Sequence, residues 1–549
     1  MATRSSRTRA PSQTGVGAPD DQVFVRRATG LIREASALDA TIYNLIWASI
    51  PIALVLVFLY GPAFYTNANL YVGTIAAAVL ALPIALLYAF LASAMPRSGA
   101  DYVWVSRTIH PALGFMSNLS FNFWVTYFIG VYATLLGTWG LSSVFRVLAA
   151  YTGRAGFLDV ADFFVTEWGV FLLGCALVVF CGGLFILSRG LETFLRFQRW
   201  GFILWLVGGI LLAGLVLLVT NPDAFAGRFD AYVTSLDGPA GAHAAALQNG
   251  AVTRSGATFG GSLLAVTLPY YTMGFLFQSA YFGGEIKRGK GTHLLSIPGS
   301  VVLAALLMLF IIGVYVSRVG MDLLAAIGAA DPTSYGLGFA PLYPELAAIA
   351  ANNVVLALLI VVGFALGFIV WVPQTIILIS RSLFAWSFDR LLPEKVAEVN
   401  PRTHSPIVAT LIIMAAGLVS VGILAFNPDL TALVGLFGLT LTYIVVSIAG
   451  LLFPYRQPEV FAASPYTGRV GGIPLVSIVA AVSLVASLII AVILLRDVNS
   501  GTSWEVNRGT VLLAFGVFLA GLPLYYLLRA VQRSRGIDVD LAYKEIPPD

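Results

Sequence analysis

The sequence contains few charged residues for its length. Only 11% of its 549 residues are charged, whereas soluble domains carry about 25%, and 58% are hydrophobic. Long apolar runs recur along the chain, and about 20 apolar residues are enough to cross a bilayer. The composition excludes an ordinary soluble protein and predicts an all-α integral membrane protein.

Cysteine and histidine are scarce as well. The only cysteines, Cys175 and Cys181, lie six positions apart in one apolar run. That spacing fits small buried hydrophobic side chains better than a disulfide or a metal site. No HExxH motif is present, and the four histidines fall in loops or at the ends of apolar runs: His110, His243, His293 and His404. A membrane-embedded enzyme needs buried acids, bases or metal ligands, so we do not expect one.

The chain also lacks a recognisable cleavable signal peptide, and its first 36 residues are polar and basic. We interpret residues 1–36 as a disordered cytoplasmic tail and residues 534–549 as a second cytoplasmic tail. We expect an extracellular loop at 221–261, and a further outer loop at 318–351 with a short surface helix. Between the tails the sequence predicts twelve membrane spans, here numbered in chain order, near residues 40–60, 69–95, 111–141, 168–187, 200–220, 262–282, 297–317, 352–386, 406–426, 430–453, 474–495 and 509–530.

The distribution of basic residues predicts the orientation of these spans. If the N-terminus is cytoplasmic, 24 of the 31 Lys and Arg residues fall in inner segments and 7 in outer loops. Inner loops of membrane proteins are enriched in Lys and Arg. We therefore expect a multi-pass protein of the cell membrane with both termini in the cytoplasm.

Two of the predicted spans are poor continuous helices. Span one carries Pro51 within an apolar run, and span six carries Pro269 followed by Gly274. Proline removes a backbone donor and glycine weakens a helix by roughly 1 kcal/mol. Interrupted spans at matching places of two halves indicate a transporter's binding site. The alternative is that each proline merely kinks its helix, as prolines in membrane helices often do.

The two interrupted spans divide the chain into comparable halves. Spans one to five (residues 37–220) match spans six to ten (residues 262–454), and an odd number of spans turns the second half upside down. The pattern predicts a 5+5 inverted repeat, with spans eleven and twelve (residues 455–533) peripheral to it.

Three segments on the cytoplasmic side resemble one known family. The segments are MPRSGADYVWVSRTIHPALG at 95–114, SRSLFAWSFDRLLPEKVAEVNPRTHSP at 380–406, and the acidic-then-basic stretch at 283–290. They are similar, in the same order, to the loop after span two, the end of span eight and the exit from span six of the amino acid–polyamine–organocation (APC) permeases. With the spacing of the spans, the resemblance covers roughly residues 36–455.

The resemblance implies the LeuT-type fold and secondary transport of amino acids or related amines. The glycine-rich break of the family's first span is replaced here by Trp-Ala-Ser-Ile-Pro. The substrate contacts that the resemblance implies lie on spans one and six: Ala48, Ser49, Ile50, Pro51, Tyr271, Thr272, Met273 and Gly274.

The chemistry of a broken helix suggests which substrate these spans bind. Free amides at one half-helix suit a carboxylate, and free carbonyls at the other suit an ammonium or a small cation. The middles of spans one, three, six, eight and ten contain no charged side chain. Arginine and polyamines would want a buried carboxylate, so we predict an amino acid with a neutral, apolar side chain. Alternatives are another small amine or organic solute, or an amino-acid exchanger.

The coupling ion is a further hypothesis. Polar groups of Gln374 and Thr375 on span eight, with carbonyls near Trp47, could hold Na⁺ through oxygen ligands. The alternative is that Thr375 bonds its own helix and Gln374 lines a water path. Proton-coupled relatives often carry a lysine in span five, and the matching stretch at 201–214 has none.

Other polar and aromatic residues carry two interpretations each. Asn122 and Tyr127 on span three could line the cavity or hydrogen-bond across helices. Tyr271 could gate the site or simply pack. Glu285, with Lys287 and Arg288, is predicted to form an inner-gate or interfacial ion cluster, and so are Arg97, Asp101 and Arg107.

Competing classes fit less well. A major-facilitator carrier has two parallel six-span halves, a long inner loop after span six and a Gly-Asp-Arg-rich loop after span two, which this sequence lacks. A channel would show a repeated filter or a ring of charges. The expected partners are a small-molecule substrate and membrane lipid, with no nucleic acid and no particular oligomeric state predicted.

Overall fold

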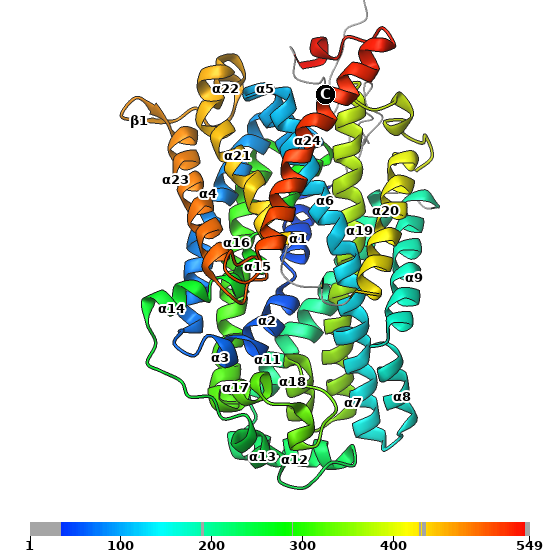
Figure 1. Ribbon diagram of the computed structural model, residues 1–549, viewed down its shortest axis with the longest axis vertical. Coiled ribbons are helices and arrows are strands. Elements are labelled where there is room, and N and C mark those ends of the chain that lie inside the picture. Colours follow the sequence, from blue (N-terminus) through cyan, green and yellow to red (C-terminus); the bar gives the residue numbers. More distant parts are fainter. Residues whose placement is uncertain are drawn as a thin grey trace, which may run out of the picture.

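The computed structural model describes residues 35–187, 191–287, 289–403, 405–427, 430 and 435–543. Residues 1–34 and 544–549, with Arg288 and His404, lie outside the described residues, and so do most of the two predicted tails. The described chain is mostly helical (Figure 1). Eleven of its helices are long and apolar enough to cross a membrane, which confirms an all-α membrane protein.

These eleven helices coincide with eleven of the twelve predicted spans. Span six is the exception, because it is divided into shorter pieces. Span one is α1 (Ala37–Trp47), α2 (Ile50–Leu59) and α3 (Gly61–Phe64). The others are α4 (Leu70–Ala94), α6 (Pro111–Leu135) with α7 (Ser142–Thr152), α9 (Glu167–Ile186), α10 (Leu191–Leu204) with α11 (Ala213–Leu218), α16 (Gly289–Arg318), α19 (Val354–Phe388), α20 (Ile407–Ala425), α21 (Gly435–Arg456), α23 (Leu475–Arg496) and α24 (Arg508–Ser534).

Several helices begin at side chains that cap them. The Ser36 hydroxyl accepts a hydrogen bond from the Asp39 amide at 3.2 Å, and the Asp39 carboxylate accepts one from the Ser36 amide at 2.9 Å. This reciprocal pair satisfies amides that the first turn of α1 leaves unpaired. Thr166 and Asn353 cap α9 and α19 in a similar way. Local sequence therefore fixes where these spans start.

Two spans contain a π-helical segment. The segment η1 (Leu136–Leu141) joins α6 to α7, and η2 (Trp205–Leu212) joins α10 to α11. Such widened turns are rare and often lie at functional sites. At η2 the backbone approaches α19 so closely that a Cβ on Gly209 would lie 2.8 Å from the Phe364 nitrogen. The glycines here serve helix packing.

The connecting elements separate into two ends. One end carries α5 (Asp101–Thr108), α22 (Pro458–Ala463) and the β1–β2 hairpin (Arg469–Val470 and Ile473–Pro474) (Figure 1). The opposite end carries α8 (Gly156–Phe163), α12 (Pro222–Ser235), α13 (Ala242–Asn249), α17 (Met321–Ala329) and α18 (Tyr343–Ala351). We call them the α5 end and the α12 end.

The region predicted as a loop with one surface helix, 318–351, differs from that expectation. It holds α17, a 3₁₀ turn η4 (Pro332–Tyr335) and α18, and most side chains of α17 and α18 are buried. Their apolar faces pack on α2, α3 and α19. The expectation of a surface helix was wrong. In the sequence, a buried helix of this outer layer cannot be distinguished from an apolar loop.

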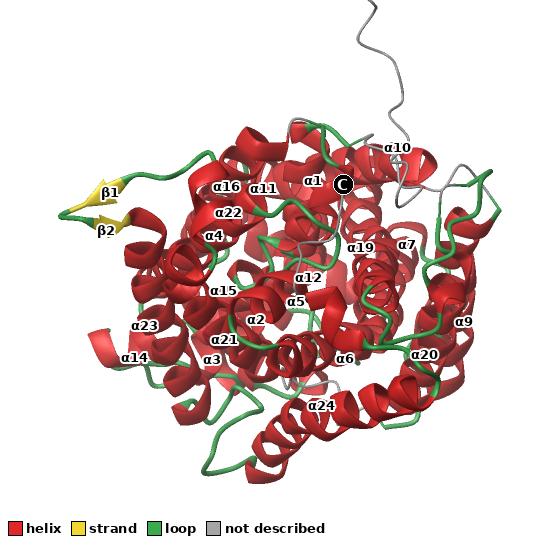
Figure 2. Ribbon diagram, turned by 90° about the horizontal axis from the view of Figure 1, so that it is seen from above, coloured by secondary structure: helices red, strands yellow, loops and turns green. Residues whose placement is uncertain are grey.

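Seen from above, α2 and α15 (Thr267–Met273) lie near the middle of the helix bundle, and α23 and α24 lie at its edge (Figure 2). The most apolar stretches of α23 and α24 are 39% and 28% buried, against 94% for that of span one. Exposed apolar side chains on α23 and α24 fit a position against lipid. That spans eleven and twelve lie outside an inverted repeat stays a prediction.

Candidate functional site

Span one is interrupted in the middle of the bundle. Its helix α1 ends at Trp47 and α2 begins at Ile50, and between them Ser49 has a left-handed backbone with φ of 47°. A left-handed conformation costs an L-residue roughly 1–2 kcal/mol. Pro51 lies in the first turn of α2, where a missing amide hydrogen removes no helical bond. The interruption therefore precedes the proline and does not coincide with it.

Span six is interrupted more extensively. It comprises α14 (Phe259–Leu264), α15 and a 3₁₀-helical segment η3 (Gln278–Glu285), with the residues from Gly274 to Phe277 outside any helix. Pro269 lies in the first turn of α15, so it starts a half-helix as Pro51 does. The main break falls at Gly274–Phe277, so it begins at the predicted glycine and five residues beyond Pro269.

The two interruptions lie against each other. α15 packs on α2, and η3 packs on α1. The Asn44 side-chain oxygen of α1 accepts a hydrogen bond from the Ser279 amide of η3 at 2.9 Å. The carbonyl oxygen of Gly274 accepts one from the Tyr443 hydroxyl of α21 at 2.8 Å. Side chains thus hold backbone groups that the breaks release, which non-helical backbone at membrane depth requires.

Aromatic rings fill the space around both interruptions. Trp371 stacks on Tyr132 with ring centroids 3.7 Å apart and meets Trp47 edge-on at 4.7 Å. Phe275 of the span-six break lies 6.1 Å from the Trp47 ring and 5.7 Å from the Phe128 ring. In this conformation the packed rings fill the space between the two interruptions.

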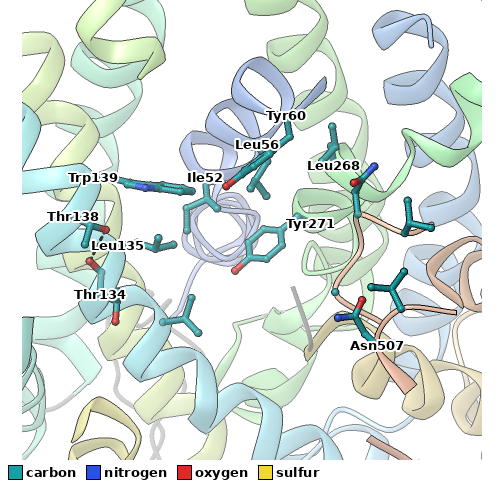
Figure 3. A pocket seen from close by; sticks show the side chains of 15 residues that line it. Ile52, Leu56, Tyr60, Thr134, Leu135, Thr138, Trp139, Leu268, Tyr271 and Asn507 are labelled. Atoms are coloured by element: carbon teal, nitrogen blue, oxygen red, sulfur yellow. Dashed lines mark hydrogen bonds between the residues drawn. The ribbon is translucent and has the colours of Figure 1, made fainter. Parts of the chain in front are cut away.

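A cavity of about 580 Å³ adjoins the breaks on the side of α2 (Figure 3). Its volume suits a small organic ligand. Tyr271 and Leu268 of α15 project into it opposite Ile52 and Leu56 of α2 (Figure 3). Its lining contains no charged side chain and consists of Ile52, Leu56, Tyr60, Val131, Thr134, Leu135, Thr138, Trp139, Leu268, Tyr271, Val498, Asn499, Gly501, Val506 and Asn507.

The wall of this cavity comes partly from unexpected places. Thr138 and Trp139 belong to the π-helical segment η1, and Asn499 and Asn507 belong to the loop between α23 and α24. The Tyr65 hydroxyl, just after α3, donates a hydrogen bond to the Asp497 carboxylate at 2.6 Å and fastens that loop to span one. The π-helical turn and the loop beyond the predicted repeat gave no sequence signal of a site.

Of the ten residues predicted to bind substrate, only Tyr271 lines this cavity. Ala48, Ser49, Ile50, Pro51, Thr272 and Met273 are buried at the two interruptions, beside Gly274 at the start of the span-six break. The Thr272 hydroxyl is buried without a hydrogen-bond partner among the described residues. Such a group keeps its full hydrogen-bonding capacity.

Asn122 and Tyr127 lie in a different place. They line an apolar groove of about 430 Å³ between α6, α19 and α20, together with exposed side chains such as Phe123 and Val419. The Asn122 amide nitrogen donates to the carbonyl oxygen and side-chain oxygen of Asn118. The structure does not bring these two residues to the cavity beside α2.

The residues predicted to hold Na⁺ are buried but have different surroundings. Trp47 contributes ring packing, whereas the carbonyl oxygen of Gln374 accepts a hydrogen bond from the Tyr43 hydroxyl at 2.9 Å. The Gln374 side chain donates to Gln198 at 3.2 Å. Its own side-chain oxygen and the Thr375 hydroxyl have no hydrogen-bond partner within the described chain. Two oxygens suited to a hard cation are therefore uncommitted.

The α5 end of the bundle is closed by buried ion pairs. The Arg381 guanidinium of α19 makes two hydrogen bonds of 2.7 Å to the Glu285 carboxylate, and both side chains are 2% exposed. Arg107 of α5 makes two bonds of 2.6 Å to Asp389. Bidentate pairs of this kind are strong and directional. The predicted cluster of Glu285 with Lys287 and Arg288 is replaced by the pair with Arg381, because Lys287 is exposed and Arg288 lies outside the described residues.

The comparison with known families agrees with this geometry. A family model described as amino acid permease matches residues 40–518. No curated protein matches the chain. The matched region includes both interrupted spans, the cavity lining and the ion pairs at the α5 end.

Proposed function

The chain belongs to the amino acid permease family, an APC superfamily family to whose members a LeuT-type fold is attributed, and we propose that it is a secondary active transporter of amino acids with neutral, apolar side chains. The observation that carries this proposal is the cavity beside the two interrupted spans. It is bounded by apolar, hydroxyl and amide side chains and by no charged one. A cationic substrate would leave its charge without a partner there.

In the proposed binding mode, the substrate lies between the interruptions of spans one and six. Amides at the start of α2 attract the carboxylate, and carbonyls at the end of α1 and around Gly274 attract the ammonium. The apolar side chain extends toward Ile52, Leu56 and Leu268. This binding mode requires the rings of Phe275 and Tyr271 to turn aside. The two rings therefore separate the cavity from the proposed binding site.

The transport cycle follows from the two ends of the bundle. We propose that the α12 end faces the outside and the α5 end the cytoplasm, as the distribution of Lys and Arg indicates. The cavity then faces outward while the pairs Glu285–Arg381 and Arg107–Asp389 hold the inner end closed. Span six, as a twelfth and broken span, completes two inverted halves that rock about the site.

Na⁺ is a candidate for the coupling ion. The free oxygens of Gln374 and Thr375 support it, together with carbonyls near Trp47. Oxygen ligands of this kind are those that hard cations prefer. A Na⁺ requirement for substrate binding would support this site.

A thermal-shift screen of the purified protein tests the proposed substrate class. The protein is heated with each of the twenty standard amino acids and with putrescine, in NaCl and in choline chloride. A ligand stabilises the state it binds. We expect leucine-like amino acids to raise the melting temperature and putrescine to leave it unchanged. Selective stabilisation by putrescine or arginine would overturn the proposed substrate class. Equal shifts in NaCl and in choline chloride would exclude Na⁺ as the coupling ion.

A further inference from the structure

Asp101 occupies a junction of the inner gate. It is the first residue of α5 and follows Gly99 and Ala100, whose backbones have φ of 91° and 32°. The Gly99 amide donates a hydrogen bond to the Tyr281 carbonyl oxygen of η3 at 3.1 Å. A Cβ on Gly99 would lie 2.7 Å from the Ala385 Cβ of α19. Asp101 therefore lies where η3 of span six meets α5 and α19.

The Asp101 carboxyl group is buried without a basic partner. Its exposure is 0%, and one oxygen accepts a hydrogen bond from the Asn118 side chain of α6 at 2.8 Å. The other oxygen has no hydrogen-bond partner in the described part of the chain. The titratable groups around it are the hydroxyls of Tyr88 on α4, Tyr281 on η3 and Tyr443 on α21.

Two arginines of this layer pair with other acids. Arg107 binds Asp389, and Arg381 binds Glu285. His293 of α16 is buried beside Gly283 and Pro96, where a Cβ on Gly283 would lie 3.2 Å from its Nε2 atom. No basic group in the described chain forms an ion pair with Asp101.

Four other buried acids differ from Asp101 in this respect, whereas Asp497 is held by the Tyr65 hydroxyl. Asp39 pairs with Arg199 at 2.6 Å, Glu345 lies 3.8 Å from Arg146, and Glu285 and Asp389 hold their arginines at 2.7 and 2.6 Å. A buried carboxylate without a cation is costly unless it is protonated. Burial raises the pKa of Asp101 to about 7, against opposing contributions from the Tyr281 hydroxyl, then from Asn118 and the first amides of α5.

A series of polar side chains leads from the broken helix to Asp101. Tyr443 bonds the Gly274 carbonyl, and the Gln278 amide lies beside the Tyr443 hydroxyl. The Tyr88 ring lies 6.0 Å from the Tyr443 ring. The hydroxyls of Tyr88 and Tyr281 and both amide atoms of Gln278 are buried without partners among the described residues. Groups of this kind can pass a proton when water bridges them.

We propose that Asp101 is a proton-binding site that couples transport to a proton gradient. The carboxyl group holds one proton while the inner gate is closed. When span six and the gate helices separate, water reaches Asp101, its charged form becomes stable, and the proton leaves to the cytoplasm. Outward return requires a new proton, taken from the outer side through the tyrosine series. This inference rests on the proposed transport function and makes the proton its driving ion, with Na⁺ at Gln374 and Thr375 as the competing candidate.

The test uses the full-length protein in liposomes and Na⁺-free buffer, with radiolabelled L-leucine as the probe. At pH 6.5 outside and 7.5 inside, one proton per substrate accumulates leucine by up to about tenfold in the wild type. Asp101→Asn keeps the size and the Asn118 contact but cannot ionise. We expect its accumulation ratio to fall to about one while leucine counterflow stays within about twofold of wild type. Asp159→Asn, an exposed acid of α8, is the matched control and should behave as wild type.

Accumulation by Asp101→Asn in response to the pH gradient would overturn the proposal, as would wild-type leucine transport that ignores the gradient. Failure of the wild type to exchange any neutral amino acid would contradict the transport function instead. Infrared spectroscopy gives a readout that needs no substrate. At pH 6 the wild type and Asp159→Asn should show the stretching band of a protonated carboxyl group, which Asp101→Asn lacks. Absence of that band from the wild type would also overturn the proposal.

Discussion

At the residue scale, Tyr271 connects the cavity to the interrupted spans. Its ring projects into the cavity and lies 6.0 Å from Phe128 and 5.9 Å from Phe275 (Figure 3). It is therefore both a wall of the outer cavity and a part of the aromatic barrier. In the proposed binding mode, a substrate that enters from the cavity meets this side chain first.

Replacing Tyr271 should weaken substrate binding. Tyr271→Ala removes a buried ring worth about 1.5–3 kcal/mol of apolar contact, so we expect leucine affinity to fall roughly ten- to hundredfold. Tyr271→Phe keeps the ring and should change affinity much less. Equilibrium binding of labelled leucine measures both, with Tyr455→Ala, at a 60% exposed position, as control. Unchanged affinity in Tyr271→Ala would remove this residue from the site.

Asp101 makes stability depend on pH in a direction that can be worked out. Its pKa is raised from 3.8 to about 7 in the folded protein, so between these values the folded state holds a proton that the unfolded chain has lost. Raising the pH through this window therefore disfavours the folded state, by up to about 1.4 kcal/mol per pH unit. We expect the melting temperature of Asp101→Asn, relative to that of the wild type, to rise as the pH increases from 5 to 7. A constant difference between the two curves would contradict a raised pKa.

At the scale of elements, the ion pair between η3 and α19 holds the broken half of span six. Both partners are buried, and removing one of them leaves the other charge without compensation, at a cost of about 3–5 kcal/mol. We expect Arg381→Met or Glu285→Gln alone to lower the melting temperature strongly and the double variant to recover most of the loss. The exposed pair Arg254–Asp322 is a matched control, and Arg254→Met should have little effect. If the melting temperature fell equally in the single and double variants, an unpaired buried charge would not be the cause of the loss.

The interrupted elements also show what could be predicted from sequence. The presence of breaks in spans one and six followed from proline and glycine in apolar runs, and the structure has both. Their positions could not be read from the prolines, because Pro51 and Pro269 start half-helices. The partner of Glu285 lies 96 positions away, so no local pattern identifies Arg381. The cavity wall from η1 and residues 498–507 was missed, since apolar periodicity does not reveal a π-helical turn or the return of a peripheral loop.

At the scale of the whole molecule, charge and burial describe a protein that crosses a membrane. The connecting elements lie at two opposite ends (Figure 1). The long helices between them expose apolar side chains. The excess of Lys and Arg in alternate loops predicts that the α5 end faces the cytoplasm. The predicted inverted repeat requires span six to cross with its break, which is why α14, α15 and η3 matter to the topology.

Cysteine labelling in intact cells tests the orientation. In a background with Cys175→Ala and Cys181→Ala, Asp159→Cys places a thiol on α8 and Glu394→Cys places one between α19 and α20, both at exposed positions. A membrane-impermeant maleimide should label Asp159→Cys at once and Glu394→Cys only after the cells are permeabilised. The reverse order would invert the topology and turn the cavity toward the cytoplasm.

The central claim is that a neutral amino acid binds where spans one and six are interrupted. A structure determined by electron cryo-microscopy with bound L-leucine tests it most directly. The account predicts ligand density between Ala48–Ile50 and Tyr271–Gly274, with its side chain toward Ile52 and the Phe275 ring displaced. Density confined to the groove between α6, α19 and α20, with both interruptions still filled by aromatic rings, would contradict it.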